Sequence, residues 1–210
     1  MKLIAYDLEG VLVDKKSIWI DISKITGTLE INRGHRERYV RGEISYEEWS
    51  DIVVASWKGF SVNKIDQLVR SSPLMNGSEH AVQKIKDKGY HQVIISNSIT
   101  LLADRIGEKL GIEGDCITAN ILEVKDDKLT GRLSLHHGWQ DKVKTLKRYA
   151  KIMGIDLKDT VAIGDDINDI EMIKKAGLGI AFDPKNDLLK EAADIVINVK
   201  NLRAILTHIK

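Results

Sequence analysis

The feature that most constrains the fold of this chain is a series of short apolar runs, each followed by residues with helical spacing. Such runs are typical of strands buried on both faces, and their alternation with helices predicts a parallel sheet covered on both sides. The expected strands lie within Leu3–Tyr6, Val93–Ile95, Val161–Ile163, Leu178–Ala181 and Ile195–Ile197. We therefore predict an α/β protein with a doubly wound, three-layer α/β/α arrangement.

The stretch between the first two strands breaks this alternation. Its apolar residues recur at helical spacing, as at Ile18, Ile22 and Ile25, and it contains no clear strand. The glycines that punctuate it are Gly27, Gly34, Gly42 and Gly59. We expect a small inserted helical cap over residues 14–72, while residues 1–13 and 73–210 form the core domain.

Two further segments depart from the strand-and-helix alternation. Residues 117–133 have the pattern of a short β-hairpin, with its turn at Lys125–Lys128. After the last strand, Leu202–Ile209 is expected to form a closing helix.

Composition excludes several classes of protein. The 210 residues include 32 Lys and Arg against 31 Asp and Glu, so no basic excess points to a nucleic acid partner. No apolar run approaches the roughly 20 residues of a membrane span. The single cysteine, Cys116, has no partner within the chain for a disulfide, which favours the reducing cytoplasm. We expect a cytoplasmic monomer or homodimer that does not bind a membrane.

Polar side chains gather where three of the predicted strands end. They are Asp7 and Glu9 after the first strand, Ser96 and Asn97 after the second, and Asp165, Asp166, Asn168 and Asp169 after the third. The carboxyl ends of parallel strands meet at one edge of the sheet, where ligands of open α/β sheets bind. Carboxylate and amide oxygens suit Mg²⁺, and a hard cation among carboxylates most often serves phosphate chemistry. A turn or helix cap is the plainer reading of each cluster taken alone.

Four ordered motifs at these positions resemble those of the haloacid dehalogenase superfamily phosphatases. They are D-L-E-G-V at Asp7–Val11, V-I-I-S at Val93–Ser96, a lysine at Lys142 that opens a predicted helix, and G-D-D-I-N-D at Gly164–Asp169. The resemblance covers nearly the whole chain and is nearest to the phosphoserine phosphatase branch, which shares the helical cap and the hairpin.

The resemblance implies a phosphomonoester hydrolase that acts on a small phosphorylated metabolite. Asp7 would be the nucleophile that forms an aspartyl-phosphate, and Glu9 would be the general acid and base. Ser96, Asn97 and Lys142 would bind the phosphoryl group. The resemblance also implies Mg²⁺ as cofactor. Its expected site residues are Asp7, Glu9, Asp165, Asn168 and Asp169.

Several positions depart from the family pattern. Glu9 stands where the family has Asp, and a related branch with this residue passes the phosphoryl group to an alcohol such as homoserine, so a phosphotransferase is an alternative. Lys16 and Asp51 fall where phosphoserine enzymes hold the substrate amine and carboxylate with charges of opposite sign, which argues against specificity for phosphoserine. A non-catalytic binding protein on the same scaffold is a remote alternative.

The remaining candidate groups have plainer interpretations. The basic run within residues 33–41 is expected to be a solvated cap face, with binding of an anionic substrate or partner as the alternative. His136 and His137 are expected to lie on the loop that leads to Lys142 rather than to bind a metal. Tryptophans at positions 19, 49 and 57 are expected in the cap core or at its interface, where one could line the substrate pocket.

Overall fold

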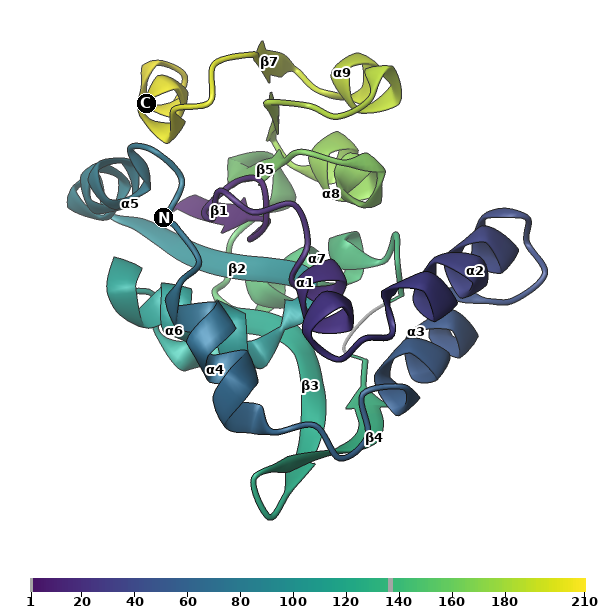
Figure 1. Ribbon diagram of the computed structural model, residues 1–210. Helices are drawn as coiled ribbons and strands as arrows, with labels where there is room; N and C mark the ends of the chain where they lie inside the picture. The colour runs from purple at the N-terminus through teal and green to yellow at the C-terminus, as the bar shows by residue number, and fades with distance from the viewer. Residues whose placement is uncertain (1, 136–137) are drawn as a thin grey trace.

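A seven-stranded sheet forms the centre of the computed structural model, which describes residues 2–135 and 138–210 (Figure 1). Its strands are β1 (Lys2–Tyr6), β2 (Tyr90–Ile99), β3 (Ile117–Lys125), β4 (Lys128–Ser134), β5 (Thr160–Gly164), β6 (Leu178–Phe182) and β7 (Ile195–Ile197). They lie in the order β4-β3-β2-β1-β5-β6-β7, and only the β3–β4 pair is antiparallel among the described pairs. The predicted α/β fold is confirmed.

Alternate side chains of β1 enter two separate cores, one on each face of the sheet. Ile4 and Tyr6 pack with residues of α5 (Ser78–Asp87) and α6 (Thr100–Leu110). Leu3 and Ala5 pack on the other face, with residues of α7 (Lys142–Ile152) and α8 (Ile170–Lys175). This period-2 alternation is what a strand buried on both faces requires, and each large apolar side chain buried contributes about 1.5–3 kcal/mol. The remaining core elements are α9 (Asp187–Ala192) and the 3₁₀ helices Gly114–Cys116, Leu157–Asp159, Ile167–Asp169 and Leu202–Thr207.

Four helices lie between β1 and α5. They are α1 (Ile18–Ile25), α2 (Leu29–Val40), α3 (Tyr46–Ala55) and α4 (Val62–Arg70). In Figure 1, α2 and α3 lie side by side, and α3 also contacts β4 at the edge of the sheet. Ser45 and Glu48 form a capping box that starts α3. Three of the four glycines predicted to punctuate this segment have positive φ, but Gly34 lies inside α2 and ends no helix.

The second predicted strand is longer than its apolar run. β2 continues from Val93–Ile95 to Ile99, so Ser96 and Asn97 lie within it rather than after it. Its pairing with β1 stops at Ile94, however, and its register with β3 shifts after Ile95. Both polar residues therefore still lie beyond the end of the central strand.

The two other irregular segments differ in outcome. The hairpin is confirmed, with β3 and β4 joined through Asp126 (φ 50°) and Asp127 (φ 57°), the left-handed pair that a tight hairpin turn needs. The closing helix is a 3₁₀ helix over Leu202–Thr207 and stops short of Ile209. Across the described part of the chain, no helix has both the length and the apolar character needed to cross a membrane.

Candidate active site

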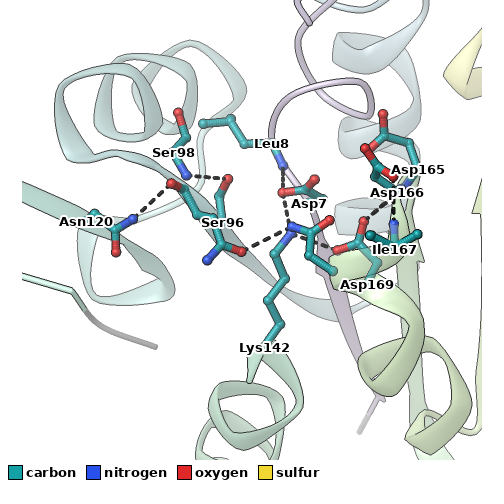
Figure 2. A network of polar contacts seen from close by, with 12 residues as sticks. Asp7, Leu8, Ser96, Ser98, Asn120, Lys142, Asp165, Asp166, Ile167 and Asp169 are labelled. Atoms are coloured by element: carbon teal, nitrogen blue, oxygen red, sulfur yellow. Dashed lines mark hydrogen bonds and ion pairs between the residues drawn. The ribbon is translucent and has the colours of Figure 1, made fainter. Parts of the chain in front are cut away.

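A buried lysine, Lys142, contacts the side chain of Asp7 at the end of the central strand β1. Asp7 follows β1 directly, and its main-chain N–H donates to the Ile163 carbonyl at 2.9 Å, which extends the pairing with β5. The Asp7 carboxylate accepts a hydrogen bond from the Leu8 N–H at 2.7 Å and lies 2.8 Å from Lys142 Nζ (Figure 2). Lys142 is the first residue of α7 and has no exposed surface. This arrangement fixes one carboxylate beside one ammonium at the rim of the sheet.

Asp169 holds Lys142 from the other side. Its Oδ1 lies 2.7 Å from Lys142 Nζ, while its Oδ2 accepts hydrogen bonds from the main-chain N–H groups of Asp165 (3.0 Å) and Asp166 (3.2 Å). Gly164 leaves the space for this side chain, because a Cβ there would overlap the Asp169 carboxyl group. Burial raises the pKa of Asp169 to about 6, against the opposing effect of Lys142. Burial also opposes the Lys142 charge, yet the two carboxylates raise the pKa of Lys142. Lys142 therefore stays protonated.

Three carboxylates form a group whose geometry fits a divalent cation. Oxygens of Asp7, Asp165 and Asp169 lie within 4.8 Å of one another, and all three residues are buried. Burial raises the pKa of Asp165 well above its usual range, and the Asp7 charge adds to this effect. Carboxylates at this spacing are hard oxygen ligands, so the residues present fit Mg²⁺ or a similar hard ion. Because Asp169 is already bound by Lys142 and the main chain, Asp7 and Asp165 are the carboxylates with oxygens left to offer.

Lys185 is a site residue that our sequence analysis missed. Its ammonium forms an ion pair with Asp165, and its main-chain N–H donates to the Asp165 carbonyl at 2.9 Å. It lies in the loop after β6, which is a fourth strand end at the same rim. The rule that located the other clusters, polar groups at the carboxyl ends of parallel strands, would have found Lys185 had it been applied to this strand.

Glu9 connects the end of the first strand to helix α1. Its Oε1 accepts a hydrogen bond from the main-chain N–H of Ile18, the first residue of α1, at 2.5 Å. Partial burial is the largest influence on Glu9 and raises its pKa to about 7, although the Ile18 bond opposes that rise; the nearby Asp7 charge adds to it. A carboxyl group with this pKa exchanges protons readily near neutral pH, as a general acid and base must.

Ser96 and the two asparagines also come together at this rim. The Ser96 hydroxyl is buried and accepts a hydrogen bond from the Ser98 N–H at 3.2 Å. The Asn168 side chain donates to Asn97 Oδ1 at 3.1 Å and thereby joins the fourth motif to the second. The structure therefore brings together the predicted residues of the first, second and fourth motifs, and Asn168 supports a neighbouring side chain.

Asn97 also links helices α1 and α3 to the sheet. Its carbonyl accepts a hydrogen bond from Trp19 Nε1 of α1 at 3.2 Å, and its Nδ2 donates to the Tyr46 hydroxyl of α3 at 3.3 Å. Neither cap contact follows from the local sequence, because both depend on how the helices pack over the sheet. Asp166 is partly buried, and its carboxylate accepts a hydrogen bond from the Ile167 N–H at 2.8 Å.

A cavity of about 460 Å³ lies between these strand ends and helices α1, α2 and α3. Its walls include Asp7, Glu9 and Ser96 from the core, and Lys16 from the loop before α1. Asp51 is exposed and is not part of this wall. Lys16, a predicted substrate-binding residue, therefore borders the cavity, whereas Asp51 lies outside it. His136 and His137 are outside the described residues.

Comparison with known proteins agrees with this geometry. Residues 126–209 match the family described as haloacid dehalogenase-like hydrolase. The chain is 37% identical over 210 residues to the phosphoserine phosphatase of Methanocaldococcus jannaschii, covering all of this chain and 98% of that protein. It is 32% identical to the phosphoserine phosphatase of Archaeoglobus fulgidus, again over the whole of this chain but only 60% of the relative.

Solved structures are similar over the same length. A phospho-aspartyl intermediate analogue of phosphoserine phosphatase superimposes with a TM-score of 0.87 at 37% identity, over 100% of this chain and 99% of that one. A substrate-bound phosphoserine phosphatase complex does so with a TM-score of 0.85 at 36% identity, over 100% and 98%. The chain therefore belongs to the haloacid dehalogenase-like hydrolases, in the family of the phosphoserine phosphatases.

Proposed function

We propose that this enzyme hydrolyses a small phosphorylated metabolite through an aspartyl-phosphate on Asp7. The observation that carries the proposal is the placement of Asp7, which touches Lys142 at 2.8 Å and has Asp165 among the carboxylates within 4.8 Å. A carboxylate held in this position beside an ammonium can act as the nucleophile toward phosphorus. Membership in a family that includes a solved phospho-aspartyl intermediate analogue supports the same chemistry.

The reaction would run in two displacements at phosphorus. In the first, an Asp7 oxygen attacks phosphorus, the bond from phosphorus to the alcohol oxygen breaks, and Glu9 gives its proton to the departing alcohol. In the second, Glu9 takes a proton from water and the water oxygen attacks phosphorus. The bond from phosphorus to the Asp7 oxygen breaks, which releases inorganic phosphate and regenerates the Asp7 carboxylate. The pKa of Glu9, raised to about 7, suits both proton transfers.

The other residues would hold the phosphoryl group and stabilise its charge. Lys142 would neutralise one phosphoryl oxygen next to Asp7, and the Ser96 hydroxyl with the Asn97 main chain would donate hydrogen bonds to the others. When bound, Mg²⁺ would offset the charge of the phosphoryl group. Asp7, Asp165 and the Glu9 carbonyl would hold it, with Asn168 and Asp169 in support. Residues 14–72 would form a cap over the site. The enzyme would be a cytoplasmic monomer or homodimer.

The test measures phosphate release from p-nitrophenyl phosphate with Mg²⁺ and with EDTA. We expect Asp7→Asn to lose nearly all activity, because the nucleophile is gone, and EDTA to have a similar effect on the unmodified enzyme. Asp51→Asn, which alters an exposed cap carboxylate outside the cavity, should keep full activity. Equal phosphate release by the unmodified enzyme and Asp7→Asn would reject the proposal.

Phosphoryl transfer to an alcohol is a second candidate, favoured by Glu9. A glutamate carboxyl reaches about one bond length further than an aspartate carboxyl, and catalysis is sensitive to displacements of about 1 Å. The same base can deprotonate water or an alcohol. If transfer occurs, added homoserine should become phosphorylated and free phosphate should fall by the same amount; an unchanged yield of free phosphate argues for hydrolysis alone.

A further inference from the structure

The cap side of the cavity offers positive charge and aromatic surface but no carboxylate. Among the described residues that line the cavity, the acidic ones are Asp7, Glu9, Asp165 and Asp166, and all of them belong to the strand ends of the core. The proposed chemistry already uses the first three. An ammonium group on a substrate would therefore find no acidic partner on the cap.

Two cations on the cap side of the cavity are without acidic partners. Within residues 2–135 and 138–210, Lys16 and Arg36 line the cavity and form no ion pair. Their neighbours differ, since Lys15 pairs with Asp21 at 2.5 Å and Arg33 pairs with Glu30 at 2.7 Å. Lys16 and Arg36 come from different elements, the loop before α1 and helix α2, yet both border the same space. Unpaired cations at the edge of a binding cavity favour an anion there.

Aromatic rings form much of the remaining wall of the cavity. The rings of Trp19 and Trp49 stack with centroids 5.9 Å apart and planes 19° apart, and Tyr46 packs on Trp139 with centroids 5.4 Å apart. All four residues line the cavity. Large aromatic faces bury flat apolar groups well, and a space of about 460 Å³ is within the range that holds ring-sized ligands.

We infer that the enzyme prefers phosphomonoesters whose alcohol carries a second anionic group on a flat, ring-sized body. The inference rests on the proposed function, because it places the phosphate at Asp7. The second anion would lie toward Lys16 and Arg36, and the flat body would lie against the aromatic wall. An amino-bearing phosphomonoester would be a poor substrate, because its ammonium would face Lys16 and Arg36 with no cap carboxylate to bind it.

The test compares three aryl phosphates that differ in one para substituent, which is anionic, neutral or cationic. They are para-carboxymethylphenyl, para-methylphenyl and para-aminomethylphenyl phosphate, which are anionic, neutral and cationic beyond the phosphate. We expect kcat/KM to fall in that order, with about a tenfold or greater gap between the first and the last. Equal kcat/KM for the anionic and cationic esters would overturn the inference.

Charge-reversal variants test which residues cause the preference for an anionic substituent. In Lys16→Glu and in Arg36→Glu, the ratio of kcat/KM for the anionic ester to that for the cationic ester should fall about tenfold. Arg41→Glu is the matched control, because Arg41 is an exposed cap arginine that does not line the cavity. A ratio that stays constant in both charge-reversal variants would overturn the assignment to these residues.

The aromatic wall has its own measurement. Trp139→Ala should raise KM for the three aryl esters about fivefold or more, and should leave KM for phosphoglycolate, which has an anion but no ring, unchanged. An equal rise for both kinds of ester would overturn the role of the ring surface. If none of the esters, including p-nitrophenyl phosphate, releases phosphate, the proposed function fails and takes this inference with it. Hydrolysis without a charge preference overturns the inference alone.

Discussion

Lys142 shows how this protein keeps a charged side chain without any exposed surface. Its ammonium lies between Asp7 at 2.8 Å and Asp169 at 2.7 Å, and these contacts replace the water that burial removed. Such a buried group adds little net stability over an apolar one, but removal of one member leaves charge uncompensated and costs about 3–5 kcal/mol. The charges of Lys142, Asp7 and Asp169 are therefore paired with one another before any ligand binds.

We predict that Lys142→Met lowers the free energy of unfolding of the metal-free protein by about 3–5 kcal/mol at about pH 7.5, with a smaller loss at about pH 5. A carboxyl group whose pKa is raised by folding loses stabilisation as the pH rises through that pKa. The pKa of Asp169 is already raised to about 6, and it rises further without the lysine, so protonation removes the uncompensated charge in acid. Urea denaturation in EDTA at both pH values measures this. Lys147→Met, an exposed lysine on the same helix, is the control, and a loss independent of pH would contradict the prediction.

Glu9 leads to a prediction about the pH dependence of activity. Protonated Glu9 is the form that donates to the alcohol, and its pKa is raised to about 7, so kcat/KM for an alkyl phosphate should fall as the pH rises through that value. Glu9→Gln should lower kcat/KM for phosphoglycolate by about 10²–10⁴ and abolish that limb of the profile. The loss for p-nitrophenyl phosphate should be much smaller, because its leaving group needs little protonation. Equal losses on the two esters would show that Glu9 is not the acid.

At the scale of elements, the turn after β1 depends on one glycine. Gly10 has φ +88°, and a Cβ there would overlap the Asp165 carboxylate. Gly27, between α1 and α2, has a similar φ of +74° but open space around it. A substitution at Gly27 therefore tests backbone strain alone, whereas one at Gly10 also displaces a site residue.

We predict that Gly27→Ala costs about 1–2 kcal/mol of stability, the strain of a left-handed alanine, and leaves kcat/KM unchanged. Gly10→Ala should cost more stability than that and lower kcat/KM by about 10² or more, because Asp165 must move relative to Asp7. Urea denaturation and initial rates on both variants measure these effects. Similar kcat/KM values in the two variants would mean that the contact of Gly10 with Asp165 has no catalytic consequence.

The strands and their polar ends were predictable from the sequence because both follow from local rules. An apolar run such as Val161–Ile163 marks a strand buried on two faces, and a parallel sheet brings the ends of such runs together. The end of β2 was misplaced because Ser96 and Asn97 are polar, although their backbone stays extended up to Ile99. The interaction of Asn97 with the cap and the exposure of Asp51 depend on how helices pack across the sheet, which local patterns do not encode.

At the scale of the whole molecule, the active site is where charges from several distant parts of the chain have to balance. Three buried carboxylates face two lysines there, Lys142 from α7 and Lys185 from the loop after β6. A phosphate ester brings further negative charge into the same space. A divalent cation held by Asp7 and Asp165 would offset this negative charge. Without the cation, Lys185 is paired with Asp165. Lys185 and the metal ion are therefore expected to compete for Asp165.

This competition gives a prediction for Lys185→Gln. In EDTA, the variant should lose about 1–2 kcal/mol of unfolding free energy, because Asp165 keeps its burial but loses its cation. With saturating Mg²⁺ most of that loss should disappear, since the ion replaces the lysine, and a roughly tenfold tighter affinity for Mg²⁺ corresponds to about 1.4 kcal/mol. Urea denaturation with and without Mg²⁺ measures both effects, and Lys190→Gln, which removes an exposed pair with Asp187, is the control. An equal loss in both solutions would mean that Lys185 supports Asp165 also when the ion is bound, and that the two do not compete.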